Sequence, residues 1–221
     1  MEKIIEQVTQ WDFLQKVPQE LFGFTLISEM MTCGSQYRIF TYNNSVRHRS
    51  FSILYDKATK EFLARIVIGL TEFCDISFIT GDIVLLEKIL KERLERTLRG
   101  LANFDPASLC LRFRQKKIME WAYISQLPKQ LSGFELFINP QESVKALNGS
   151  YVIIDYSDFA TESNFTVNYN IYRDEFFSEI RLKRTPIMTA DFDAKTLTEL
   201  EGRLTEKLHQ TLESLRLKLQ K

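Results

Sequence analysis

The clearest pattern of polar and apolar positions lies at residues 164–172, which read NFTVNYNIY. Every second residue is apolar, so these side chains would share one face of a strand: Phe165, Val167, Tyr169 and Ile171. The polar residues between them would share the other face. The segment is therefore predicted to be a half-buried strand with one face turned to water or to a partner. The equivalent segment at residues 51–55 would place Phe51, Ile53 and Tyr55 on one face. A turn and a second apolar run follow each segment, which indicates two hairpins.

Leucine recurs at three- or four-residue spacing in two later segments, which is typical of amphipathic helices. The first helix would follow Thr80-x-Asp82 and run to about residue 101. The second would follow Thr189-x-Asp191 and run from about residue 193 nearly to the C-terminus. Because a short oxygen side chain can accept the free N–H groups of a first helical turn, Asp82 and Asp191 are the expected caps.

Shorter amphipathic stretches at about 2–16 and 114–126 predict helices that end before Pro18 and Pro128. Proline lacks the N–H group that a helix interior needs, so these two residues mark helix ends. Further strands are expected at 37–43 and 150–156, and short ones at 73–79 and 186–189.

Two parts of the sequence resemble each other. Residues 11–26, WDFLQKVPQELFGFTL, match residues 121–136, WAYISQLPKQLSGFEL, with six identities at an offset of 110. The offset becomes 114 after a longer loop in the second copy, and further pairs then follow: Tyr37/Tyr151, Ile39/Ile153, Tyr42/Tyr156, Phe51/Phe165, Tyr55/Tyr169, Phe62/Phe176 and Ile66/Ile180. Self-similarity of this kind predicts an internal duplication.

The expected fold class is α+β, with a first repeat at residues 1–110 and a second at residues 111–221. Each repeat would be an antiparallel sheet of four or five strands, with a short helix before it and a long amphipathic helix closing it. A sheet covered on one side leaves a face or an edge that needs cover, so the two repeats are expected to pack about a pseudo-twofold axis.

Composition narrows the classes of protein that fit. The charges of the 29 basic and 29 acidic residues cancel. The protein therefore lacks the strong net charge that would attract nucleic acid or a membrane surface over its whole face. Nothing approaches an 18-residue apolar run, and the N-terminus lacks the pattern of a signal peptide, so no membrane association is expected. Three cysteines without Cys-x-x-Cys spacing are expected to be buried thiols in a reducing cytoplasm.

The sequence contains few candidate catalytic or metal-binding residues. The residues shared by the two copies are mostly packing and turn residues, and Glu61 and Glu175 are expected to be exposed charges at strand ends. His48 and His209 have no Ser or Cys nucleophile pattern beside them. The chain lacks the usual phosphate-binding, zinc and hydrolase motifs. We therefore expect a protein that is not an enzyme and that uses neither cofactor nor metal.

The leading functional interpretation is a cytosolic protein-interaction or scaffold module that binds a protein partner or a second copy of itself. Its binding surface would be an open sheet face or the overhanging leucine stripe of the last helix: Leu208, Leu212, Leu215 and Leu219.

Two alternatives stay open. Basic residues near aromatic ones suit phosphate contact and base stacking, which would make the protein a single-stranded nucleic-acid binder. The residues concerned are Arg38, Arg47, Arg49, Arg112, Arg114, Lys116 and Lys117. The doubled layout of antiparallel strands followed by a helix is similar, in topology alone, to that of the Whirly and PUR-type single-stranded nucleic-acid binders. The second alternative is a small apolar ligand held between the repeats.

Overall fold

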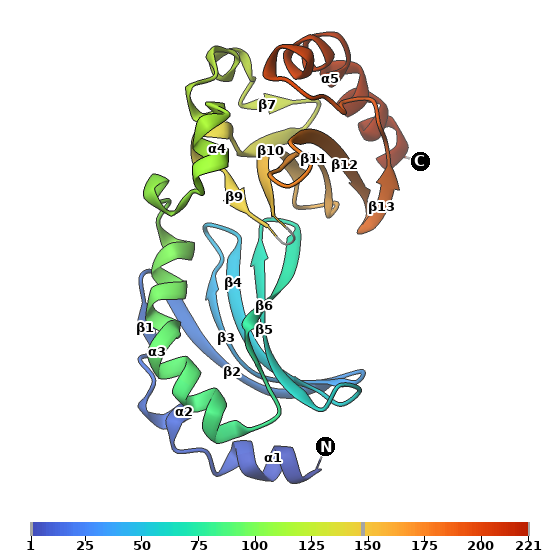
Figure 1. The fold of residues 1–221 in the computed structure, drawn as a ribbon. Coiled ribbons are helices and arrows are strands. Elements are labelled where there is room, and N and C mark those ends of the chain that lie inside the picture. The colour runs from blue at the N-terminus through green and yellow to red at the C-terminus, as the bar shows by residue number, and fades with distance from the viewer. Residues whose placement is uncertain (1, 147–148, 221) are drawn as a thin grey trace. The chain divides into compact units, whose positions relative to one another are not determined.

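The computed structural model describes residues 2–146 and 149–220 and divides into two compact units, Met1–Phe104 and Asp105–Lys221, called unit 1 and unit 2 here (Figure 1). The division falls earlier than the expected boundary at residue 110. Each unit combines an antiparallel sheet with helices, so the expected α+β class is confirmed. Among the described residues, no helix combines the length and apolar character needed to cross a bilayer.

Unit 1 is a six-stranded meander in which each strand pairs with the next along the chain. Its helix α3 (Ile83–Ala102) contacts both β1 and β6, the two edges of the sheet, so the sheet curls around the helix. Two short helices, α1 (Glu2–Thr9) and α2 (Phe13–Lys16), precede the sheet. The strands are β1 (Glu20–Leu21), β2 (Phe24–Cys33), β3 (Gln36–Asn44), β4 (Arg49–Asp56), β5 (Glu61–Ile68) and β6 (Thr71–Thr80).

Unit 2 has a seven-stranded sheet whose main path runs in the same order, with β9 pairing to β10 beside it. Helix α5 (Leu197–Leu219) contacts β7 and β12. The strands are β7 (Gln130–Leu131), β8 (Phe134–Ile138), β9 (Val144–Lys145), β10 (Ser150–Asp158), β11 (Ser163–Asn170), β12 (Glu175–Leu182) and β13 (Thr185–Met188). The expected four or five strands per sheet were too few, mainly because short strands such as β1, β7 and β9 carry no alternation that a sequence pattern can register.

The segments before the two sheets are broken, whereas single helices were expected at 2–16 and 114–126. In unit 1 the break falls at Trp11, whose ring turns inward and stacks on Phe13 with ring centroids 5.0 Å apart. In unit 2 the segment consists of α4 (Leu111–Gln115) and the 3-10 turns η2 (Ile118–Glu120) and η3 (Ala122–Gln126). Two further turns, η1 (Pro106–Ser108) and η4 (Pro140–Glu142), lie elsewhere in unit 2.

The two long helices begin differently. Oδ1 of Asp82 accepts hydrogen bonds from the N–H groups of Val84 (2.7 Å) and Leu85 (2.9 Å), so this expected cap is confirmed. Asp191 is not a cap, because α5 is capped by Thr196, whose Oγ1 accepts from the N–H of Glu199 at 3.1 Å. The backbone of Ala194 is hydrogen-bonded to Phe176 on β12, which keeps residues 190–195 out of the helix.

The leucine stripes fill the interiors of the units. Leu208, Leu212 and Leu215 are buried and Leu219 is half-buried, so the predicted overhanging stripe is wrong. Helix α5 contacts β7 and β12 of the sheet, and the apolar residues Phe165, Val167 and Tyr169 of β11 are fully buried as well. Removing both apolar surfaces from water is worth about 25 cal/mol per Å², which explains why this stripe faces inward.

The polar face of β11 is also buried, whereas the alternation predicted a face turned to water or a partner. Asn164, Thr166 and Asn168 are each at most 5% exposed. The Nδ2 group of Asn164 donates to Asp155 at 3.3 Å, and that of Asn168 donates to Thr166 at 3.3 Å. These hydrogen bonds within the sheet offset part of the cost of removing the polar side chains from water.

All three cysteines are free thiols. Cys33 is exposed, while Cys74 and Cys110 are half-buried, so the expectation of three buried thiols is wrong. Cys33 ends β2 beside the turn at Gly34, where the strand has left the cover of the core.

Candidate binding pocket on unit 1

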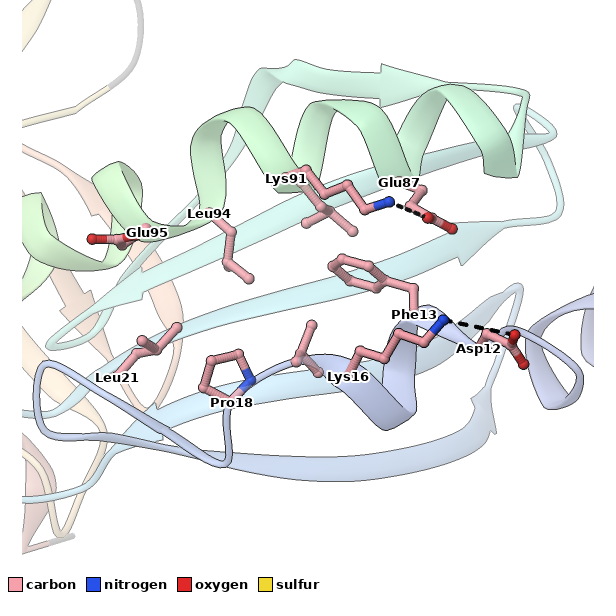
Figure 2. A pocket seen from close by; sticks show the side chains of 11 residues that line it. Asp12, Phe13, Lys16, Pro18, Leu21, Glu87, Lys91, Leu94 and Glu95 are labelled. Atoms are coloured by element: carbon pink, nitrogen blue, oxygen red, sulfur yellow. Dashed lines mark hydrogen bonds and ion pairs between the residues drawn. The ribbon is translucent and has the colours of Figure 1, made fainter.

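A pocket of about 310 Å³ lies on unit 1 between α3 and the segment that runs from α2 to β1 (Figure 2). Its lining consists of Asp12, Phe13, Lys16, Val17, Pro18, Leu21, Glu87, Leu90, Lys91, Leu94 and Glu95. The apolar members lie between the helix and the segment, and the charged members stand along the two rims (Figure 2).

Two hydrogen bonds hold the wall opposite α3 in place. Nε1 of Trp11 donates to Oε2 of Glu87 at 2.7 Å, which ties the start of α2 to α3. The hydroxyl of Tyr42 on β3 donates to the carbonyl oxygen of Pro18 at 2.5 Å, which ties the other end of the wall to the sheet. Since the helical turn ends just before Pro18, the wall consists of the turn α2 and the extended stretch that leads from Val17 to β1.

The interior of the pocket is apolar. Phe13, Val17, Leu90 and Leu94 are buried, yet they leave an open space beside them. A dry cavity of about 150 Å³ is enough for a benzene-sized molecule, so this pocket has room for about two such groups. Apolar pockets with few polar groups at the rim are the usual form of a binding site.

The rim carries charges of both signs. Lys91 pairs with Glu87 at 2.6 Å, and Lys16 approaches Asp12 at 3.9 Å. The hydrogen bonds from Lys91 and then from Trp11 lower the pKa of Glu87. With Glu95, the lining holds three carboxylates against two ammonium groups and is therefore net negative at neutral pH.

Unit 2 has the same two anchors at the matching sequence positions. Nε1 of Trp121 donates to Glu201 at 3.0 Å, and the hydroxyl of Tyr156 donates to the carbonyl of Pro128 at 2.8 Å. Between these anchors, however, the hydroxyls of Tyr123 and Thr205 are hydrogen-bonded at 3.3 Å. Their counterparts in unit 1 are Phe13 and Lys91, which leave the gap open.

The matching rim of unit 2 also lacks the charge pairs. Ala122 and Gln126 stand where unit 1 has Asp12 and Lys16, and His209 stands where unit 1 has Glu95. The charged rim is therefore particular to unit 1.

The basic residues proposed for nucleic-acid binding in unit 1 contact their own unit. Arg47 and Arg49 donate to the carbonyl oxygens of Ala102 and Leu101, the last residues of α3. Cations at a helix C-terminus satisfy carbonyls that have no partner within the helix. Arg38 pairs with Glu29 at 2.9 Å and lies about 20 Å along β3 from the turn that carries Arg47, so unit 1 does not gather the three.

In unit 2, Arg112 donates to the carbonyl of Ile171 at 2.7 Å, and Lys116 pairs with Asp174 at 2.6 Å. Arg114 and Lys117 are exposed. Five of the seven residues thus stabilise the local fold, and nucleic-acid binding stays a prediction.

Among the residues that the structure describes, no group of three or more His, Cys, Asp or Glu side chains could hold a metal ion.

Sequence reasoning missed the pocket, although part of its signal is present. Asp12 and Lys16 are four residues apart, as are Glu87 and Lys91, and each pair stands beside buried apolar positions. The sequence does not reveal that these two segments face each other across an unfilled gap.

No family model, no curated protein and no solved structure matches the chain.

Proposed function

We propose that the protein is a non-catalytic cytoplasmic interaction module, and that the pocket of unit 1 binds an apolar segment of a protein partner. The observation that carries this proposal is an open apolar pocket whose wall is pinned at both ends, by Trp11–Glu87 and by Tyr42–Pro18. A pinned wall keeps the pocket formed before anything binds, which lowers the entropy cost of binding.

Three features favour a protein segment over a small apolar ligand. The pocket is partly open to the surface and is lined by residues 87–95 of α3, so a chain segment can lie along this helix. Charged groups flank the apolar strip on both rims, which suits a segment that has both apolar and polar side chains. Phe22, next to the lining residue Leu21, is 37% exposed and extends the apolar surface past the pocket.

We further propose that the two units are copies of one ancestral unit. The matching Trp–Glu and Tyr–Pro hydrogen bonds and the identical order of the main strands support this. The bulge between β3 and β4 at Ile39 also has a counterpart between β10 and β11 at Ile153. On this proposal, one copy kept an open pocket and the other closed it with Tyr123 and Thr205. The pseudo-twofold packing of the copies stays a prediction that a crystal structure would check.

The pocket can be tested by giving unit 1 the residues of unit 2. The double variant Phe13→Tyr with Lys91→Thr places the bridging pair of unit 2 across the gap. A fluorescein-labelled amphipathic peptide of about 15 residues, built from leucine and lysine, is titrated into each protein and followed by anisotropy. We expect the double variant to bind the peptide at least about tenfold more weakly than the unchanged protein.

The matched control is Thr205→Val, which removes the bridge of unit 2 and leaves the pocket of unit 1 untouched. It should bind like the unchanged protein. Equal affinity of the double variant, or no binding by the unchanged protein, would contradict the proposal. A labelled oligothymidylate is titrated in parallel, because binding that weakens steeply with salt would favour the nucleic-acid alternative instead.

A further inference from the structure

We infer that the segment bound in the unit 1 pocket is a cationic amphipathic helix, with two apolar residues flanked by basic ones. This inference rests on the proposed function and adds the chemistry of the partner to it. It follows from where the carboxylates of the rim lie and from which of their oxygens are already engaged.

Carboxylates lie at the two ends of the pocket. Asp12 marks one end and Glu95 the other, with the apolar residues between them (Figure 2). Asp12 meets Lys16 only at 3.9 Å, and its side chain is 79% exposed. Glu95 receives Arg99 on one oxygen, at 2.7 Å, and its side chain is 65% exposed. Both carboxylates therefore keep acceptor positions that an incoming cation can use.

The ammonium groups of the pocket are less available to an incoming anion. Lys91 already donates to Glu87 at 2.6 Å, and Lys16 points toward Asp12 (Figure 2). An anion that bound Lys91 would compete with the Lys91–Glu87 ion pair. It would leave the negative charge of Glu87 without its partner in a lining that is already net negative. The charge of the pocket thus disfavours fatty-acid carboxylates and acidic peptides, and it complements basic residues.

The spacing along α3 sets the spacing in the partner. Glu87, whose two oxygens are engaged by Lys91 and Trp11, lies at the same end of the pocket as Asp12 (Figure 2). The eight residues from Glu87 to Glu95 therefore measure the distance between the two available carboxylates along the helix, about 12 Å. A partner helix that lies along the pocket would present basic residues seven or eight positions apart on one face. Its apolar residues at the third and fourth positions between them would enter the space beside Phe13 and Leu94.

The test compares two labelled peptides of the same leucine pattern, one with lysine and one with glutamate at the polar positions. We expect the lysine peptide to bind at least about tenfold more tightly at low salt, with the difference shrinking as salt is raised. Glu95→Gln should weaken the lysine peptide about threefold, because one exposed ion pair is lost. Glu92→Gln, on the same helix but outside the pocket lining, should have no effect.

The outcomes separate this inference from the proposed function. If both peptides bind equally well and the Phe13→Tyr/Lys91→Thr variant weakens both, the charge preference is overturned and the pocket remains a protein-binding site. If neither peptide binds while dodecanoate does, the pocket takes a small anionic ligand and both proposals fail. If the double variant binds the lysine peptide as tightly as the unchanged protein does, the peptide binds elsewhere on the protein, and both the inference and the proposed function are overturned.

Discussion

Arg216 on α5 and Asp158 at the end of β10 form an ion pair at 2.9 Å that ties the end of the helix to the sheet. The guanidinium also donates to the carbonyl oxygens of Ser132 (2.8 Å) and Gly133 (2.7 Å). In unit 1 the charge arrangement is reversed, since the arginines lie on the strand side and reach the carbonyls that end α3. The two units thus solve the same problem, fastening a helix C-terminus to a sheet, with opposite placement of the cation.

Arg216→Ala is expected to destabilise the protein by about 2–4 kcal/mol, because Asp158 loses its ion-pair partner and two carbonyl oxygens lose a donor. The side chain of Asp158 is only 10% exposed, so water compensates for little of the loss. Urea denaturation followed by circular dichroism measures the change. Lys218→Ala, an exposed position on the same helix turn, is the control and should change the stability by less than about 0.5 kcal/mol. Equal effects of the two substitutions would mean that the Arg216 contacts contribute nothing.

Asp155 provides a pH-dependent prediction. Burial raises its pKa to about 6, although hydrogen bonds from Ser157 and Asn164 act in the opposite direction. Its Oδ2 is buried and, within the described part of the chain, accepts no hydrogen bond. Between pH of about 4 and about 6 the folded protein therefore holds a proton that the unfolded chain has lost. The stability contributed by this group falls as the pH rises through that window and stays low above it.

Asp155→Asn should remove this loss while keeping an oxygen that accepts from Ser157. We expect the variant to be more stable than the unchanged protein at pH 7, by an amount on the order of 1–3 kcal/mol, and equally stable near pH 4. Urea midpoints at several pH values measure the difference between the two proteins. Taking this difference cancels the opposite trend of carboxyls with lowered pKa, such as Asp158 and Asp174. A constant difference across the pH range would contradict the prediction.

The paired tyrosines separate stability from binding. Tyr42→Phe and Tyr156→Phe each remove one buried hydroxyl that donates to a proline carbonyl, and burial raises the pKa of both hydroxyls. Each substitution should cost about 1 kcal/mol of unfolding free energy. Only Tyr42→Phe should also weaken the lysine peptide, because only that hydroxyl holds a wall of the unit 1 pocket. Peptide binding lost equally in both variants would show that the effect reflects general destabilisation.

Local patterns in the sequence predicted much of the fold. The alternation at 164–172 predicted β11, Pro18 and Pro128 predicted where the preceding helical segments end, and Asp82 predicted the start of α3. Each of these signals lies within a few residues of the feature that it predicts. The cap of α5 was misplaced because the pairing of Ala194 with Phe176, eighteen residues earlier, decides where that helix can begin.

The sequence by itself determined the longer strands, the two long helices and the order in which they follow one another, because these depend on spacings of two to four residues. Only the tertiary structure decided that the polar face of β11 is buried, that Arg47 and Arg49 engage the end of α3, and that unit 1 has a pocket beside Phe13 and Leu90. These features depend on which distant segments meet and on how much space their side chains leave. Periodicity along a chain carries no information about either.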